Sequence, residues 1–403
     1  MSNTLLTIGM VTRETLMVLY NQLTFTLCVN REYDDQFAKA GAKIGNVLNV
    51  RKPVRFQPTS GQGLILQDLT ETTVPVVLNK QYQRSFAVTS ADLALNIDDF
   101  SKRFIRPAMI SMANEIDFDG LGQYINIANE VGTPGTVPNT TATYLSAGVK
   151  LDNEAAPMED RNIVISPQME ATIINALQGL FNPQVTISEQ YRKGMMTKNT
   201  LRADWYMDQN VRVQTVGPLG GTPLANAAVA QTGASIITDG WTAAAALRLK
   251  QGDVIQFANV FAVNPQNFQS TGVLKDFVVT ADVSSDGSGN ATIPISPAIV
   301  TSGPFQNVTA GVADNAAVTI NGAANTSSPR GLYFNENAFT FATADLPLYG
   351  GLDMGERKSD EQLKMSMRVI RDYDINLDRA PLRIDLLGGW ATLYQELACR
   401  IAS

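Results

Sequence analysis

Carboxylates are the side chains of this sequence with the clearest potential for chemistry, because histidine is absent altogether. Glu115, Asp117 and Asp119 lie close together, and paired carboxylates can serve as general acid and general base. Residues two apart on a helix point to different faces, so we interpret these as separate helix charges. Ser166 and Ser366 have no histidine as a base, which excludes a serine triad of the usual composition. We therefore predict no catalytic residues and no enzyme activity.

Two short motifs resemble ligand-binding loops only superficially. Gly61-Gln62-Gly63 lacks the third glycine of a dinucleotide fingerprint, and no helix start follows it, so it predicts a turn. Asp282 and Asp286-Gly287 lack the ligand spacing and final glutamate of a calcium loop, which favours a β-turn. Cys28 and Cys399 lie in apolar surroundings without metal-ligand spacing, which predicts buried free thiols. We expect neither a cofactor nor a bound metal.

Positive charge gathers in one stretch that also contains the glycine turn. Arg51, Lys52, Arg55 and Arg84 occupy runs in which apolar and polar residues alternate, a pattern typical of strands. Such cations protect an exposed strand edge from aggregation, or they dock on acidic patches of a neighbouring subunit. We favour docking, because a long two-stranded ribbon needs a partner. The candidate subunit-contact residues are Arg51, Lys52, Arg55, Gly61, Gly63 and Arg84.

The elements that position these residues follow from the hydrophobic periodicity. Residues 47–89 predict an extended hairpin with a polar tip, although two strands of an ordinary sheet joined by a long loop would give the same pattern. Residues 97–129 carry apolar residues at steps of three and four, which predicts a long helix bent at Pro107. Residues 162–165 predict a buried strand. Ser166-Pro167 then favours a helix start, so the layer is of the α+β type.

A change in composition marks an inserted segment. Residues 223–342 contain only 11 charged residues, about half the density of the whole chain. Short β-prone runs at 254–257, 260–263, 277–283 and 291–295 alternate with turn residues, which predicts a small antiparallel barrel or sandwich. After residue 343 the polarity is mixed again, and residues 363–369, 372–377 and 384–387 predict strands.

Charge and hydropathy narrow the function classes. The net charge of -7 argues against a nucleic-acid reader, which needs clustered cations. Charged residues make up only 17% of the chain, below the roughly 25% of an average soluble domain, so much of the surface is expected to meet other protein. No apolar run approaches the about 20 residues of a transmembrane helix. We expect synthesis in the cytoplasm and no membrane partner.

The inserted segment also resembles a known family. Leu249-Lys250, Gly252-Asp253, Ile255 and Phe257-Ala258, followed by Thr271-Gly272, resemble the insertion domain of P22-like podovirus coat proteins. Residues 46–56 resemble the strand that enters the long loop of that family. The order of elements is similar to the HK97-type phage capsid fold, an α+β fold with an inserted β-barrel domain.

This resemblance implies a major capsid protein and a division of the chain. It implies subunits that form the hexamers and pentamers of an icosahedral shell around double-stranded DNA, first as a procapsid with scaffolding protein and a portal. The shell would enclose DNA without sequence-specific binding, and the protein would reside in the virion. The implied parts are an N-terminal arm (1–46), an E-loop hairpin (47–89), a P-domain with a spine helix (90–150), an A-domain (151–222), an inserted barrel (223–342) and a return to the A- and P-domains (343–403).

Two other classes stay open at this point. One is a non-viral, encapsulin-like shell of the same fold, against which the insertion argues. The other is a carbohydrate-active enzyme or binding module on the β-rich segment. Sugar subsites favour exposed Trp and Tyr side chains. Residues 223–342 contain only one Trp, Trp241, and one Tyr, Tyr333.

Overall fold

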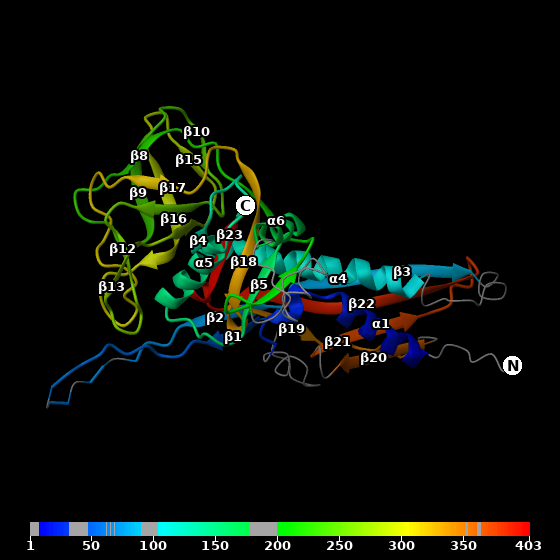
Figure 1. Cartoon of the computed structure of the whole chain (residues 1–403). Helices are drawn as coiled ribbons and strands as arrows, with labels where there is room; N and C mark the ends of the chain where they lie inside the picture. Colours follow the sequence, from blue (N-terminus) through cyan, green and yellow to red (C-terminus); the bar gives the residue numbers. More distant parts are fainter. Residues whose placement is uncertain are drawn as a thin grey trace. The chain divides into compact units, whose positions relative to one another are not determined.

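A computed structural model describes most of the chain. The described residues are 8–31, 47–61, 63–64, 66–67, 69–89, 104–177, 200–350, 354–360 and 364–403. They form two compact units. Unit 1 comprises Met1–Val50, Thr73–Leu121 and Phe339–Ala391. Unit 2 comprises Arg51–Thr72, Gly122–Ala338 and Thr392–Ser403. Some of these ranges include residues that the structure does not describe. Helices and sheets both contribute, which confirms the α+β class (Figure 1).

Unit 1 is built on a five-stranded sheet. The strand order is β19-β22-β21-β20, and β3 also pairs with β22. The strands are β3 (Lys80–Thr89), β19 (Phe339–Ala344), β20 (Met354–Asp360), β21 (Met365–Arg371) and β22 (Arg379–Thr392). Helix α1 (Ile8–Gln22) contacts β20 and β21, and helix α4 (Arg106–Leu121) contacts β3 and α1.

Helix α4 corresponds to the predicted long helix but is shorter where it is described. Its α-helical part begins at Arg106, directly after the π-helical residues Phe104 and Ile105, so Pro107 lies next to the change of helix type. It ends at Leu121, and a 3-10 turn, η3 (Gly122–Asn126), follows. Residues 97–103 of the prediction lie outside the described residues. A Cβ at Gly120 would lie 2.5 Å from the Trp390 ring, so the glycine allows this close packing.

The predicted strand at 372–377 is wrong. These residues form the turn between β21 and β22, because their side chains bond to nearby backbone instead of leaving it free for a sheet. Asp374 Oδ1 accepts the N–H of Asn376 at 3.0 Å, and Asp378 has a φ of +42°. The prediction at 384–387 falls within β22. Of the prediction at 363–369, residues 365–369 fall within β21, Lys364 is a turn residue, and Leu363 lies outside the described residues.

Unit 2 contains a mixed sheet of the order β4-β23-β18-β5-β6, and β7 also pairs with β18. Its strands are β4 (Glu130–Val131), β5 (Arg161–Ile165), β6 (Asp204–Met207), β7 (Val213–Thr215), β18 (Ser327–Asn335) and β23 (Ala398–Ala402). Helices α5 (Thr141–Asn153) and α6 (Pro167–Leu177) belong to the same unit. The predicted strand at 162–165 is confirmed, and Ser166 Oγ accepts the N–H of Met169 at 3.4 Å, as expected of an N-cap.

Unit 2 also contains the insertion, defined here as Gly221–Ile320. Its six-stranded sheet has the order β17-β11-β14-β16-β9-β8. The strands are β8 (Gly221–Ala225), β9 (Gly233–Trp241), β11 (Val254–Phe257), β14 (Phe277–Val279), β16 (Ala291–Ile299) and β17 (Val318–Ile320). A bridge between Leu224 and Ala317 brings β8 to the segment that precedes β17, so the two ends of the sheet meet. The apolar core of this sheet includes Phe257, Phe277 and Trp241.

The other strands of the insertion form two short pairs. They are β10 (Ala246–Leu249) with β15 (Val283–Ser285), and β12 (Phe261–Val263) with β13 (Ser270–Leu274). All four runs predicted as strands contain strand residues. Residues 327–342, which composition assigned to the insertion, instead form strands of the other two sheets. Charge is scarce there because β18 and β19 are almost entirely buried.

The predicted hairpin at 47–89 divides into two parts. Only β1 (Val47–Arg51) and β2 (Thr73–Val77) pair with each other. The third alternating run is β3, and it pairs along its length with β22, from Lys80 opposite Gly388 to Thr89 opposite Arg379. Between β1 and β2 lies an extended segment of unit 2, Arg51–Thr72, which we call the loop (Figure 1).

Candidate functional site

The loop exposes more large apolar side chains than a solvated turn requires. Phe56 is 62% exposed, Leu64 88%, Leu66 84% and Leu69 66%. The residues of the loop that the structure describes form no strand beyond β1 and β2. Exposed apolar groups that gather on one segment mark a surface for another protein chain.

Three of the predicted cations lie at the base of the loop. Arg51 forms an ion pair with Glu71 at 3.6 Å, and both side chains are exposed. Lys52 Nζ lies 4.7 Å from the centre of the Tyr394 ring. Arg55 Nη2 donates to Glu396 Oε1 at 2.7 Å. The base of the loop is therefore attached to the segment that precedes β23.

Burial changes the acidity of one of these cations. The pKa of Lys52 lies below its usual value of 10.5, mainly because burial disfavours the charged ammonium. Nearby Arg55 lowers this pKa further, and Glu396 opposes the shift. Lys52 is therefore a partly desolvated cation, for which contact with the Tyr394 ring replaces some hydration.

The remaining predicted residues have different surroundings. Gly61 and Gly63 lie in the exposed part of the loop, and a Cβ at either would meet no atom within 4 Å. Gly61 has a φ of +143°, a conformation that favours glycine. Arg84 lies on β3 in unit 1, where it contacts Glu115 of α4 at 2.8 Å and Ser111 Oγ at 3.0 Å. Both of these partners lie on helix α4, whereas the other three cations contact residues of the loop or of the segment before β23.

A groove of about 450 Å³ adjoins the base of the loop. Lys52 and Arg55 line it from the loop, Tyr394 and Glu396 from the segment before β23, and Phe305 from the insertion. Arg55 also lies over the ring of Phe305, 5.8 Å from its centre. The loop, the insertion and the C-terminal segment thus converge on one groove within unit 2.

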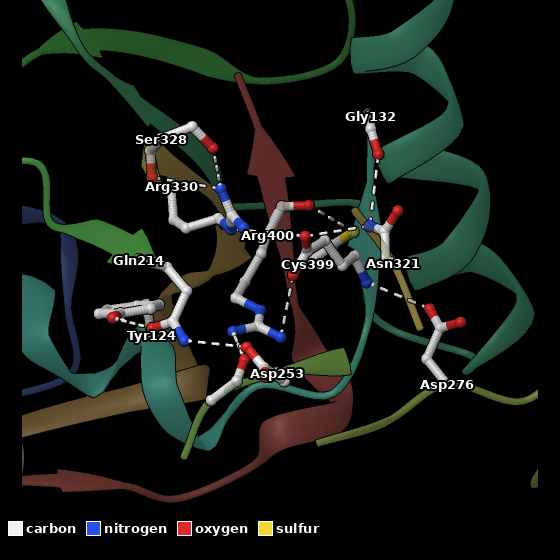
Figure 2. Close-up of polar contacts among 12 residues, drawn as sticks. Tyr124, Gly132, Gln214, Asp253, Asp276, Asn321, Ser328, Arg330, Cys399 and Arg400 are labelled. Atoms are coloured by element: carbon white, nitrogen blue, oxygen red, sulfur yellow. Dashed lines mark hydrogen bonds and ion pairs between the residues drawn. The ribbon is translucent and has the colours of Figure 1, made fainter. Parts of the chain in front are cut away.

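Sequence reasoning missed a buried charge network in the same unit. Arg400 Nη2 lies 2.9 Å from Glu130 Oε2, and Arg330 Nε lies 3.4 Å from Glu130 Oε1. None of the three side chains is more than 3% exposed. Asn321 of the segment after β17 donates to the same carboxylate at 3.0 Å. Figure 2 shows Arg330, Arg400 and Asn321 converging on this point.

The network continues into the insertion. Asp276 accepts the Glu130 N–H at 3.1 Å and the Gln256 side-chain amide at 2.6 Å, and it pairs with Lys150 of α5. A second pair joins Lys275 to Glu154. Buried Glu130 of the mixed sheet and partly buried Lys150 and Glu154 at α5 therefore meet the buried charges Asp276 and Lys275 of the insertion.

A third group of contacts holds the start of the insertion. Asp253 Oδ2 accepts the N–H groups of Lys250 at 2.9 Å and Gly217 at 3.0 Å, and Gln214 donates to Oδ1 at 3.3 Å (Figure 2). Burial raises the pKa of Asp253, while these hydrogen bonds favour the charged form. Arg400 Nη1 also donates to the Gly252 carbonyl at 2.7 Å.

One signal in the sequence points toward this network. Arg400 is a single charge inside the short apolar run 397–402, and a buried charge requires a partner. The pairing itself cannot be read from the sequence, because 270 residues separate Glu130 from Arg400.

Metal-binding clusters and membrane-spanning helices are not found among the described residues. The residues described by the structure contain no cluster of His, Cys, Asp and Glu that could hold a metal ion. Among them, no helix is both long and apolar enough to cross a membrane. Cys28 and Cys399 are buried thiols that form no disulfide, as predicted.

Comparison with solved structures returned many chains of similar fold. A chain of Mycobacterium phage Che8 is 12% identical over 95% of this chain and 93% of that chain, with a TM-score of 0.46. The capsid of cyanophage P-SCSP1u matches at 12% identity over 89% and 83%, with a TM-score of 0.42. A virus-like particle from Pyrococcus furiosus matches at 8% identity over 96% of each chain, with a TM-score of 0.40.

Comparison of the sequence with protein-family models identifies the family. No protein of curated function matches the chain. The sequence model of the family described as "P22 coat protein - gene protein 5" matches residues 57–399, which is most of the chain. That family is one of structural coat proteins, which form the protein shell of a phage. The chain belongs to the P22 coat protein family and is a shell-forming coat protein.

Proposed function

We propose that this coat protein closes an icosahedral shell of hexamers and pentamers, and that the loop supplies a contact with a neighbouring subunit. Family membership supports self-assembly into a shell. The observation that carries the role of the loop is its set of exposed apolar side chains, led by Leu64 and Leu66. Their burial between copies would contribute about 1.5–3 kcal/mol for each side chain fully buried.

The predicted contact residues divide into two roles in this proposal. Gly61 and Gly63 let the exposed part of the loop turn toward the neighbour. Arg51, Lys52 and Arg55 hold the base of the loop, and Arg51, whose side chain is 78% exposed, is the cation most available to a second copy. Arg84, paired within unit 1, would reach a neighbour only at its exposed side.

The domain division and the other partners also belong to this proposal. The arm, spine helix, A-domain and insertion implied by the family resemblance are proposed with the insertion limited to Gly221–Ile320, since strand pairing ends there. The acidic net charge of -7 supports a container that encloses DNA without gripping it. We propose a scaffolding protein and a portal as further partners, and synthesis in the host cytoplasm.

The loop is tested by shortening it beyond the hydrogen bonds that join its two arms. Gln67 donates to the Gln57 carbonyl at 2.7 Å and accepts its N–H at 2.8 Å, so residues 58–66 can be replaced by an Asn-Gly turn without removing this clamp. The variant should keep its circular dichroism spectrum and melting temperature. It should fail to form shells by sedimentation and electron microscopy, and normal shells would contradict the proposal.

A milder pair of variants separates the apolar contact from loop length. Leu64→Ser with Leu66→Ser should reduce shell yield, because the buried apolar area is lost. Val229→Ser is the matched control, since Val229 is 78% exposed but lies on the insertion, outside the loop. Equal shell yields from the double variant and the control would also count against the loop.

A further inference from the structure

The segment formed by residues 393–396 connects three parts of unit 2; we call it the relay segment. It follows β22 and leads through the 3-10 turn η6 (Gln395–Leu397) into β23. The N–H groups of Leu393 and Tyr394 both donate to the Ala338 carbonyl, at 2.9 and 3.2 Å. The side chain of Leu393 is buried, so the start of the segment is fixed to the body of the unit.

The insertion holds the middle of the relay segment. Ser296 of strand β16 donates its hydroxyl to Gln395 Oε1 at 3.1 Å. Strand β16 is central in the six-stranded sheet, where it pairs with both β14 and β9. A displacement of that sheet therefore acts on Gln395 through a direct hydrogen bond.

The loop is held by the residues on either side of Gln395. Lys52 packs on the Tyr394 ring, and Arg55 pairs with Glu396. The Arg55 and Glu396 side chains are 35% and 19% exposed, so solvent screens this pair only in part. Arg55 also touches Phe305 of the insertion. The base of the loop therefore contacts both the relay segment and Phe305 of the insertion. The insertion also holds the relay segment through Ser296.

The rest of the loop has little structure of its own to fix its direction. Its two arms are joined by the hydrogen bond from Lys52 N–H to the Thr72 carbonyl, at 2.8 Å, and by the clamp between Gln57 and Gln67. These bonds hold the two arms to each other and do not themselves involve the body of the unit. Because a strand rises about 3.3 Å per residue, a small rotation at the base moves the exposed end by much more.

We propose that the relay segment couples the position of the insertion to the direction of the loop, so that the insertion sets how the loop is presented to a second copy of the chain. The importance of the loop direction for assembly rests on the proposed function, whereas the coupling is a property of the single subunit. Coupling of this kind is reciprocal, so a loop held by a neighbour also biases the insertion.

Amide hydrogen exchange of the unassembled full-length subunit tests the coupling. Ser296→Ala should raise exchange of loop peptides covering residues 51–57, which contain the hydrogen-bonded N–H groups of Lys52 and Gln57, although Ser296 does not touch the loop. Glu396→Gln should raise exchange of the same peptides. A contact worth up to about 1 kcal/mol corresponds to an increase of up to about fivefold. The matched control is Ser235→Ala, an exposed serine on β9 of the same sheet, which should leave the loop unchanged.

The outcomes separate the relay from the role of the loop in assembly. Loop exchange that is unchanged in both Ser296→Ala and Glu396→Gln overturns the relay. If either variant lowers the melting temperature broadly, Arg55→Gln breaks the same pair from the loop side and must raise loop exchange. Raised exchange together with normal shells from the shortened loop would support the relay and contradict the assembly role.

Discussion

Replacing Glu130 by Gln should destabilise unit 2 strongly, because this carboxylate is the ion-pair partner of two buried guanidinium groups. Arg400 is fully buried at 2.9 Å from Glu130, and Arg330 is 2% exposed at 3.4 Å. The neutral amide keeps the shape and can still accept a hydrogen bond from Asn321, but it leaves both arginines without their counter-charge. Breaking a buried ion pair from one side typically costs about 3–5 kcal/mol, and we expect a loss of that order for Glu130→Gln.

The measurement is urea unfolding of the unassembled subunit, followed by circular dichroism and by hydrogen exchange in β23. Asp374→Asn is the control, because it breaks an ion pair with Arg379 in which the side chains are 27% and 45% exposed. That exposed pair should contribute no more than about 1 kcal/mol.

Replacing all three charges tests the physical reason. Glu130→Leu with Arg330→Met and Arg400→Met removes the charges together, and similar replacements in other proteins are often neutral or stabilising. The triple variant should therefore be more stable than Glu130→Gln. A loss below about 1 kcal/mol for Glu130→Gln would refute the reasoning, since the two arginines would then need no counter-charge.

Three further predictions concern packing, acidity and reactivity. Gly120→Ala should lower stability by about 1–3 kcal/mol in a thermal melt, because its Cβ would lie 2.5 Å from the Trp390 ring, whereas Gly63→Ala has open space and should change it by less than about 0.5 kcal/mol. Burial raises the pKa of Asp253 in the folded state above its ordinary value of 3.8. The wild type should therefore gain stability relative to Asp253→Asn as the pH falls from the folded pKa to about 3.8. Urea unfolding midpoints that move the other way would contradict this. Cys399 is fully buried, which raises its pKa to about 12, so a maleimide at pH 8 should label it only after denaturation.

The local sequence pattern predicted much of the secondary structure. The run at 254–257 coincides with β11, and Ser166-Pro167 correctly indicated the start of α6, because capping and alternation depend on neighbours in the chain. The turn at 372–378 was missed for a related reason. Its apolar residues alternate as in a strand, yet Asp374 bonds to the backbone two residues on, and pattern alone does not weigh that competition.

The composition of the chain determined its class, but not the partners of its charges. Absent histidine, low charge and the insertion motif in the sequence already favoured a shell protein over an enzyme. Only the tertiary structure placed β3 against β22 rather than β1, Arg55 against Glu396, and Glu130 between Arg330 and Arg400. The physical reason is that strand propensity does not specify which strand is the partner, and a charge in an apolar run does not specify its counter-charge. Both choices are made when segments far apart in sequence exclude water together.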